Sequence, residues 1–275
     1  MAKYKRKNNY ARKRKSSRKV LKVVVTIALL LFAGVVFALS PACNISKVLV
    51  QGNQTLPSKS IVQTVDLPIG DNVFYSVNGS IFDKIFMTWK TYKDKLMSKY
   101  VVIKSADFAF TLGGQVTIKI IERVPFIYIP MGEKFALVDE DGVIINIVKI
   151  KPDDGKLILK GIKFKGEKVG EKMGFAHNEG VPKVLRLFKL FEKPDQIPKQ
   201  LVSMIVAFDV SNPNNVAIDL IGNRKVLIGD TNSLGDPDLT YKLTFINSIM
   251  EKIKAGDEGV LDYSSTRDPV WSKKN

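Results

Sequence analysis

The first long apolar stretch of the chain is long enough to cross a membrane. Residues 23–46 carry no charged side chain and are rich in Val, Ile, Leu and Phe. A membrane-spanning helix needs roughly 20 predominantly apolar residues. The pattern therefore predicts a transmembrane helix over residues 23–42, followed by an exterior region that holds most of the chain.

The pattern after the span predicts a small unit over residues 45–122. A β-rich run at Ile45–Val50 precedes a short helix around Ile61–Val65, and Ser80 is a good N-cap for a second helix. That helix would bury apolar residues at helical spacing, namely Ile81, Ile85, Trp89 and Leu96.

Two strands complete this first unit. Apolar residues alternate with polar ones along residues 106–112 and again along 116–120, and Gly113-Gly114 supplies a hairpin turn between them. The order strand, helix, helix, strand, strand predicts an α+β fold with two helices on a small sheet. The edges of such a sheet are suited to the addition of a further strand.

The second exterior unit, residues 123–263, has the pattern of a mixed, sheet-rich domain with covering helices. Gly-containing turns separate its first strands, and an amphipathic helix ends at Pro194. The predicted elements are strands at 126–129, 135–138, 143–148 and 156–159, and a helix at 184–191.

The rest of this unit follows the same rules. Strands are predicted at 201–210, 216–221 and 225–228, the last two joined by the hairpin turn Gly222-Asn223. Asp236-Pro237 marks the start of a helix. Its buried stripe would be Leu239, Leu243, Ile246, Met250 and Ile253. Gly259 to Tyr263 is predicted as the final strand, and residues 264–275 as a C-terminal tail.

Charge changes the picture of the N-terminus. The net charge is +16, but residues 1–22 hold eleven Lys and Arg and no acid, and the other 253 residues carry 32 basic and 27 acidic side chains. The exterior is thus nearly balanced, which argues against a nucleic-acid partner. The basic segment is typical of a cytoplasmic tail that sets the orientation of a span and contacts anionic membrane lipid.

An alternative for the N-terminus is a cleavable signal peptide. Such peptides have an apolar region of about 7–15 residues and end at small residues, as Ser40 and Ala42 do before Cys43. The longer apolar run and the long basic segment favour an uncleaved anchor, with cleavage after Ala42 kept as the alternative. Cys43 is the single cysteine, so no disulfide supports the fold and packing alone must stabilise it.

The chain offers little catalytic chemistry. His177, the single histidine, lies in a Gly-flanked loop without a cluster of residues at metal-ligand spacing, and no phosphate-binding loop or nucleophile elbow is present. The strongest enzymatic alternative is a type II membrane glycosyltransferase that would hold a divalent ion on Asp139-Glu140-Asp141. Asp141-Gly142 between two apolar strands is more typical of a tight turn. We therefore predict no enzymatic activity, no catalytic residue, no cofactor, no metal and no small-molecule substrate.

Several segments resemble one family. Val48–Asn53 and the run Val116–Pro125, which contains Ile-Ile-Glu-Arg-Val-Pro, resemble the first and last strands of the polypeptide-transport-associated (POTRA) domain of the FtsQ/DivIB cell-division proteins. Phe135–Ile144 resembles the hairpin that opens that family's second, β-rich domain. The resemblance extends over essentially the whole chain and implies a single N-terminal transmembrane helix, a POTRA-type βααββ domain and a mixed β domain.

The resemblance also implies a function. Members of this family are non-enzymatic scaffolds of the bacterial division machinery, so it implies a single-pass type II protein of the plasma membrane, with a cytoplasmic N-terminus, enriched at the division septum. Its implied partners are the bitopic coiled-coil proteins of the FtsB/DivIC and FtsL type, bound at an exposed C-terminal β edge, and other septal division proteins. In this chain the edge maps to Gly259, Val260, Leu261, Asp262 and Tyr263, with Trp271 as an anchor.

A third class of protein is an outer-membrane translocation component that carries a POTRA module. The chain lacks the array of amphipathic strands that a membrane barrel would need, and its span is helical. The sequence therefore disfavours this class.

Overall fold

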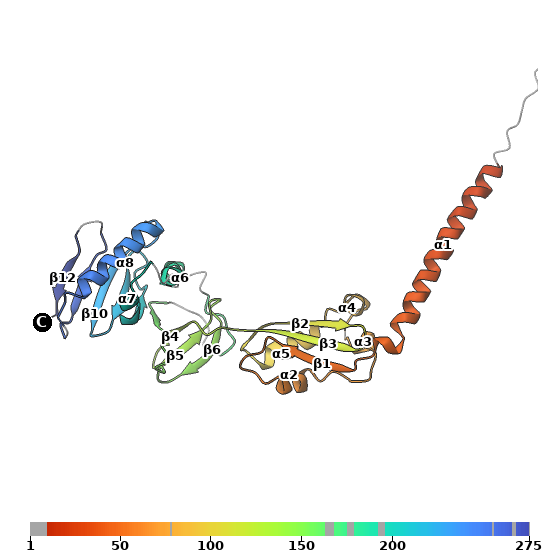
Figure 1. Cartoon of the computed structure of the whole chain (residues 1–275), viewed down its shortest axis with the longest axis horizontal. Helices are drawn as coiled ribbons and strands as arrows, with labels where there is room; N and C mark the ends of the chain where they lie inside the picture. The colour runs from red at the N-terminus through yellow and green to blue at the C-terminus, as the bar shows by residue number, and fades with distance from the viewer. Residues whose placement is uncertain are drawn as a thin grey trace, which may run out of the picture. The chain divides into compact units, whose positions relative to one another are not determined.

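A computed structural model describes residues 10–77, 79–162, 168–174, 179–191, 196–254, 256–265 and 268–274. The chain divides into two compact units, residues 1–122 and 123–275, and Figure 1 labels the elements of each. His177 and Pro194 lie outside the described residues.

The first unit begins with a long helix, α1 (Tyr10–Ala38), which has the length and composition of a membrane span. Its apolar part, Lys19–Ala38, is 20 residues long and is not buried against the rest of the protein. At a rise of 1.5 Å per residue it is about 30 Å long, which matches the hydrocarbon thickness of a bilayer. The helix ends at Ala38, four residues before the end expected at residue 42, and a 3-10 turn, η1 (Pro41–Cys43), leads into the rest of the unit.

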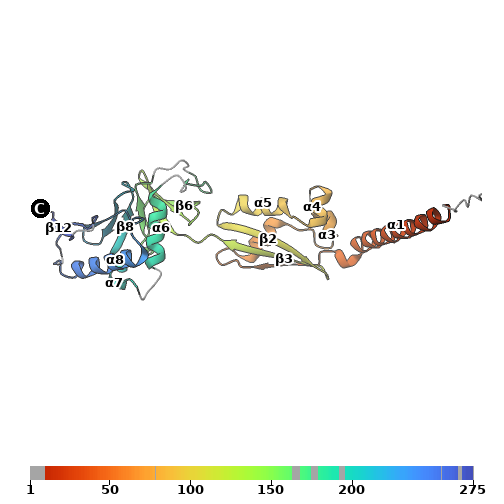
Figure 2. The same cartoon turned by 90° about the horizontal axis from the view of Figure 1, so that it is seen from above.

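The rest of this unit is a three-stranded sheet with helices on it (Figure 2). The strand order is β1-β3-β2, with β1 parallel and β2 antiparallel to the central β3. This is the predicted α+β arrangement. Its elements are β1 (Lys47–Gln51), α2 (Ser58–Val65), α3 (Val73–Ser76), α4 (Ile81–Phe86), α5 (Lys90–Lys99), β2 (Ile103–Thr111) and β3 (Gln115–Glu122).

The alternating residues of the two predicted strands face each other as expected. Ala106, Phe108 and Phe110 pair with Ile120, Ile118 and Val116. They pack on Trp89, whose ring stacks on Phe108 at a centroid distance of 5.5 Å. Cys43 is buried in the same core, so the segment that leaves α1 is part of the folded unit.

The single helix predicted after Ser80 is wrong. Met87 and Trp89 adopt left-handed backbone conformations, which separate α4 from α5. Trp89 and Leu96 are buried as predicted, but Ile81 and Ile85 are 68% and 60% exposed. The apolar residues do have helical spacing within each short helix. The break at residues 87–89, however, leaves α4 exposed while α5 packs on the core.

The second unit is built on a nine-stranded mixed sheet in the order β12-β11-β10-β9-β8-β7-β4-β5-β6. The β4–β7, β7–β8 and β10–β11 pairs are parallel, and the other pairs are antiparallel. Its strands are β4 (Ile127–Met131), β5 (Lys134–Val138), β6 (Ile144–Val148), β7 (Ile158–Lys160), β8 (Ile205–Asp209), β9 (Val216–Leu220), β10 (Arg224–Gly229), β11 (Gly259–Asp262) and β12 (Val270–Lys273).

Three helices contribute to one core with the sheet: α6 (Gly180–Phe191), α7 (Lys199–Met204) and α8 (Asp236–Met250). Phe188 and Phe191 of α6 lie against Phe208 of β8, at centroid distances of 5.2 and 6.1 Å. The predicted stripe of α8 is buried at Leu239, Leu243, Ile246 and Met250, and Ile253 follows the end of the helix, partly buried against the same core.

Two predictions for this unit are wrong. The segment predicted as one strand over 201–210 begins as α7 and becomes β8 only at Ile205. The C-terminal segment, predicted as a tail, contains β12, which pairs with β11. A strand of four residues has too little periodicity to stand out in a sequence, and its pairing is a long-range feature.

Candidate functional site

The candidate partner-binding site is the end of the nine-stranded sheet that β11 and β12 form. Gly259–Asp262 was predicted to be the outermost strand, but this is wrong. β11 lies between β10 and β12, and β12 is the outer strand. Among the described residues, no strand pairs with the other side of β12.

The free side of β12 exposes particular backbone groups. Residues of an antiparallel pair exchange hydrogen bonds at alternate positions. The Lys274 N–H donates to the Glu258 carbonyl at 2.9 Å, so Ser272 and Val270, two and four residues earlier, also direct their backbone groups to β11. The N–H and C=O groups of Trp271 and Lys273 therefore point away from the sheet, toward a possible added strand.

The six predicted contact residues lie on this two-stranded end but do not share one surface. Gly259 and Leu261 are buried, and Leu261, 1% exposed, belongs to the core. Val260 and Asp262 are exposed on the face opposite that core. Leu261 therefore offers no exposed side chain to a partner, and Gly259 has none to offer.

Trp271 is directly opposite Leu261 and packs against the edge of the core. It reaches across Gly259: a Cβ added there would lie 2.8 Å from the Trp271 ring and 2.4 Å from the Ser272 carbonyl oxygen. The absence of a side chain at Gly259 therefore leaves room for the indole beside β11. The resulting contact fixes β12 to the sheet. A role for Trp271 as an anchor for a partner stays a prediction.

An aromatic cluster beside Tyr263 was missed in the sequence. Tyr241 and Phe245 of α8 are 68% and 38% exposed, and the Phe245 ring lies 6.2 Å from Tyr241 and 5.9 Å from Tyr263. Their spacing of four residues, outside the buried stripe of α8, was the available signal. Exposed aromatic side chains are common anchors of protein interfaces.

Lys242 connects this cluster to the sheet. The residue is 6% exposed, its Nζ donates to the Ile228 carbonyl at 2.8 Å, and it lies 4.5 Å from the centre of the Tyr263 ring. Burial lowers its pKa, and the carboxylate of Asp262 opposes that effect. The end of β11 is thus held against α8 by a buried cation under an aromatic ring.

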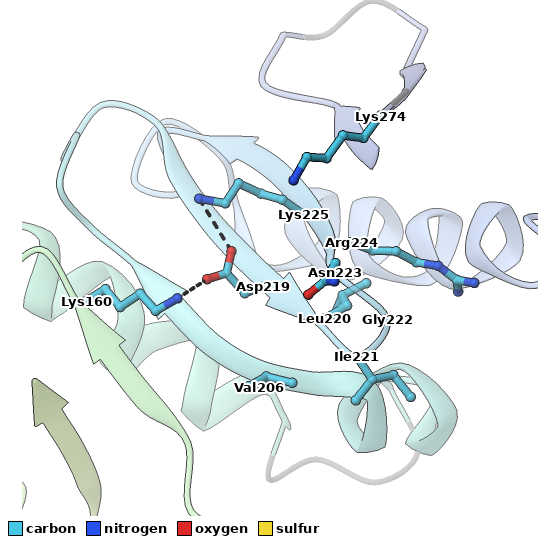
Figure 3. Close-up of a pocket in the computed structure, with 10 residues that line it drawn as sticks. All are labelled: Lys160, Val206, Asp219, Leu220, Ile221, Gly222, Asn223, Arg224, Lys225 and Lys274. Carbon is cyan, nitrogen blue, oxygen red and sulfur yellow. Dashed lines mark hydrogen bonds and ion pairs between the residues drawn. The ribbon is translucent and has the colours of Figure 1, made fainter. Parts of the chain in front are cut away.

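The open face of the same sheet carries a row of paired charges. Lys160 of β7 contacts Asp219 of β9 at 2.7 Å, and Lys225 of β10 contacts Asp219 at 3.5 Å (Figure 3). Lys225 also contacts Asp209 of β8 at 3.3 Å. Burial alone would lower the pKa of Lys225, but the two carboxylates raise it. Burial alone would raise the pKa of Asp209, but hydrogen bonds from Ser211 and Lys225 lower it.

A shallow cavity of about 450 Å³ opens beside this row. Its wall combines the charged row with the β9–β10 hairpin and with Lys274 after β12 (Figure 3). The exposed apolar side chains Val206 and Ile221 line it as well. The two lysines of the row are already paired with Asp209 and Asp219. The lining holds no pairing of a nucleophile with a general base.

The acidic triplet has a structural role. One carboxylate oxygen of Asp139 accepts from Arg123 Nη1 at 2.6 Å and the other from the Val143 N–H at 2.8 Å, with Asp139 3% exposed. Glu140 and Asp141 form the turn between β5 and β6. No group of three or more His, Cys, Asp or Glu residues suited to a metal ion occurs in the described part of the chain. The glycosyltransferase hypothesis is not supported.

Comparison with known proteins bears on the family. No family model matches the chain. The cell division protein DivIB of Clostridium tetani is 27% identical over 234 residues, 84% of this chain and 79% of the relative. The protein of the same name from Clostridium acetobutylicum is 26% identical, covering 84% of each chain, and that from Bacillus subtilis is 23% identical over 54% of this chain and 51% of its own length.

A solved structure from Geobacillus stearothermophilus, of the major extracytoplasmic domain of DivIB in its trans isomer, aligns with 48% of this chain and 98% of its own. The identity is 16% and the TM-score 0.27, too low to bear on the fold. The two clostridial relatives, by contrast, each match 84% of this chain. The predicted resemblance is thus confirmed: over most of its length this chain is related to the DivIB cell-division proteins.

Proposed function

We propose that this chain is a non-enzymatic component of the bacterial division machinery, whose exterior β domain binds single-span partners by adding a strand to β12. The relatives that share most of its length are named cell division proteins. The observation that carries the proposal is the free side of β12, where the backbone groups of Trp271 and Lys273 lack a neighbouring strand among the described residues.

The opposite end of the sheet is less suited to such addition. The beginning of β6 is already paired: Ile144 donates to the Glu171 carbonyl at 3.0 Å and accepts from the Gly170 N–H at 2.8 Å. A strand arriving at β6 would have to displace this segment. β12 requires no displacement among the described residues, so β12 is the preferred edge.

The surroundings of β12 define what a partner strand would meet. On the open face it would lie beside Val270, which is 61% exposed. On the other face it would lie beside Trp271, with the aromatic cluster of Tyr241, Phe245 and Tyr263 on the same side of the sheet. An extended partner segment with alternating apolar residues fits these two rows. Bitopic proteins of the FtsB/DivIC and FtsL type, which the resemblance implies as partners, are our proposed source of this segment.

The sharpest test uses proline at the edge. Lys273→Pro removes an N–H that points away from β11 and leaves the β11–β12 hydrogen bonds in place, and proline is tolerated on edge strands. Losing one main-chain hydrogen bond costs about 0.5–1.5 kcal/mol, and the ring also obstructs the incoming strand. We expect roughly tenfold weaker binding or more.

Lys273→Ala is the matched control, because it removes the same side chain and its ion pair with Asp257 at 2.7 Å but keeps the N–H. The measurement is the Kd of the full-length chain for FtsB/DivIC-type and FtsL-type exterior regions. Equal Kd values for the proline and alanine variants would refute strand addition at β12. Removing all of 259–275 is a poorer test, because it also deletes the core residue Leu261.

The N-terminal part of the chain sets the location of this site. We propose that residues 1–22 remain in the cytoplasm on anionic lipid while both compact exterior domains lie outside, with the protein enriched at the septum. The charge asymmetry around α1 supports this orientation. Protease added to intact protoplasts should remove the exterior region and spare an N-terminal tag. Protection of the exterior region would refute the orientation.

A further inference from the structure

Helix α4 presents an apolar surface of unusual density. Ile81, Phe82, Ile85 and Phe86 are 68%, 67%, 60% and 72% exposed, and α4 contains no buried residue. Soluble proteins rarely expose a patch of four large apolar side chains within six consecutive residues. The family resemblance and the proposed edge of β12 do not account for it.

The patch is held by a well-defined local structure. Ser80 and Asp83 form a reciprocal capping box, and the Asp83 carboxylate also accepts from the Thr88 hydroxyl at 2.9 Å. Gly79 allows this arrangement, because a Cβ there would lie 2.6 Å from an Asp83 oxygen, and its φ is +127°. Immediately after α4, Trp89 is buried in the core of the unit. The apolar side chains are therefore displayed from a structured turn.

The position of this turn relative to the span is set by hydrogen bonds within the first unit. The Asn72 side chain donates to the carbonyl of Ala38, the last residue of α1, at 2.8 Å. Asn72 is also the N-cap of α3, accepting from the Phe74 N–H at 3.0 Å. A bilayer that surrounds the apolar part of α1, whose length matches the hydrocarbon thickness, would place Ala38 at the boundary of that layer and the start of α3 among the headgroups.

Helix α4 follows α3 after a short connection, and the two helices contact each other. Figures 1 and 2 both show α3 and α4 at the end of the unit from which α1 departs. Tyr75 of α3 is 65% exposed at the same end. Tyrosine is enriched at the headgroup level, where its ring and hydroxyl meet different surroundings.

We propose that α4 inserts its apolar side chains into the outer leaflet of the membrane that α1 crosses. The surface lies at the end of the unit from which α1 departs. Lys84 within α4 and Lys90 at the start of α5 supply cations for anionic headgroups, as in interfacial helices. So short a helix would bind lipid weakly alone, but α1 keeps it at a high effective concentration near the surface. The insertion would restrict the tilt of the first exterior domain on the membrane.

The test attaches an environment-sensitive nitrobenzoxadiazole label to the cysteine of Phe86→Cys. The background is Cys43→Ala, so that the label has a single site. The full-length chain is embedded in nanodiscs of phosphatidylglycerol and phosphatidylcholine. The control label is at Ile121→Cys, an apolar side chain that is 58% exposed near the far end of β3. β3 is parallel to β1, so it runs away from the span, and Ile121 lies about 20 Å beyond the start of β3. Circular dichroism of each variant checks folding.

We expect the label at residue 86 to show a blue-shifted emission that lipids with a doxyl group near the headgroup quench, while the label at 121 stays unquenched. Adding Ile81→Ser and Ile85→Ser to the labelled Phe86→Cys chain should reduce the quenching. A water-like, unquenched emission at residue 86 would overturn the proposal and leave a protein partner as the occupant of α4. Equal quenching at 86 and 121 would also overturn it, because the contact would not be specific to α4.

Discussion

Replacing Asp139 by Ala should destabilise the second unit, because this carboxylate holds two groups at once. It accepts from Arg123 Nη1 at 2.6 Å and from the Val143 N–H at 2.8 Å. The side chains of Arg123 and Asp139 are 14% and 5% exposed. The substitution leaves a poorly hydrated guanidinium without this partner and removes the acceptor that fixes the turn before β6.

The size of the effect follows from this burial. Breaking a buried ion pair by removing one partner costs about 3–5 kcal/mol. Arg123 retains some access to water, so we expect a loss near the lower limit, about 3 kcal/mol. With a denaturant dependence of roughly 2 kcal/mol per molar urea, the midpoint should fall by about 1.5 M. Asp139→Asn keeps an oxygen for Val143 and loses the charge, so its effect should be intermediate.

The assay is urea unfolding of the full chain in detergent, in a Trp89→Phe background, so that Trp271 fluorescence reports on the second unit. Glu140→Ala is the control, because Glu140 belongs to the same acidic triplet but is exposed in the turn. Its effect should stay within about 0.5 kcal/mol. An Asp139→Ala variant as stable as Glu140→Ala would show that the ion pair does not stabilise the unit.

Two further predictions concern the ends of the sheets. Burial alone would raise the pKa of Glu122, but hydrogen bonds from Thr55, Leu56 and Gln54 lower it. Glu122→Gln should therefore lower the free energy of unfolding of the first unit by about 1 kcal/mol at neutral pH. The difference from the parent should shrink as the pH falls below 4.5, the ordinary pKa of a Glu side chain, because the carboxylate then loses its charge. Urea unfolding at several pH values measures this, and a difference independent of pH would contradict it. Leu261→Ala should cost about 2–5 kcal/mol by leaving a cavity, whereas Val260→Ala on the open face should cost less than about 1 kcal/mol. Similar losses for the two variants would contradict the observed facing of β11.

The local patterns of the sequence predicted most of the elements because each depends on near neighbours. Alternation along 106–112 and 116–120 identified β2 and β3, and the hairpin residues between them fixed their pairing. Asp236-Pro237 marked the start of α8, and its apolar stripe is buried. The Ile-Ile-Glu-Arg-Val-Pro run has a physical basis as well. Glu122 holds the loop at residues 54–56, and Arg123 holds Asp139.

Other features required the tertiary structure. Helical spacing over 81–96 could not reveal that Met87 and Trp89 would adopt left-handed conformations and leave α4 outside the core. The charged row of Lys160, Asp219 and Lys225 joins three strands that are far apart in the sequence. The cluster of Tyr241, Phe245 and Tyr263 likewise depends on how α8 meets the end of β11.

The sequence alone determined that the chain has a basic N-terminal segment, one long apolar helix and, after it, segments with the patterns of strands and helices, because charge, apolar run length and residue type are local properties. Only the tertiary structure decided which strand is outermost. An edge is defined by the absence of a neighbour, and neighbours in a sheet are set by pairing between distant segments. The short β12 covers β11, and this pairing moves the candidate binding edge from Gly259–Asp262 to Val270–Lys273.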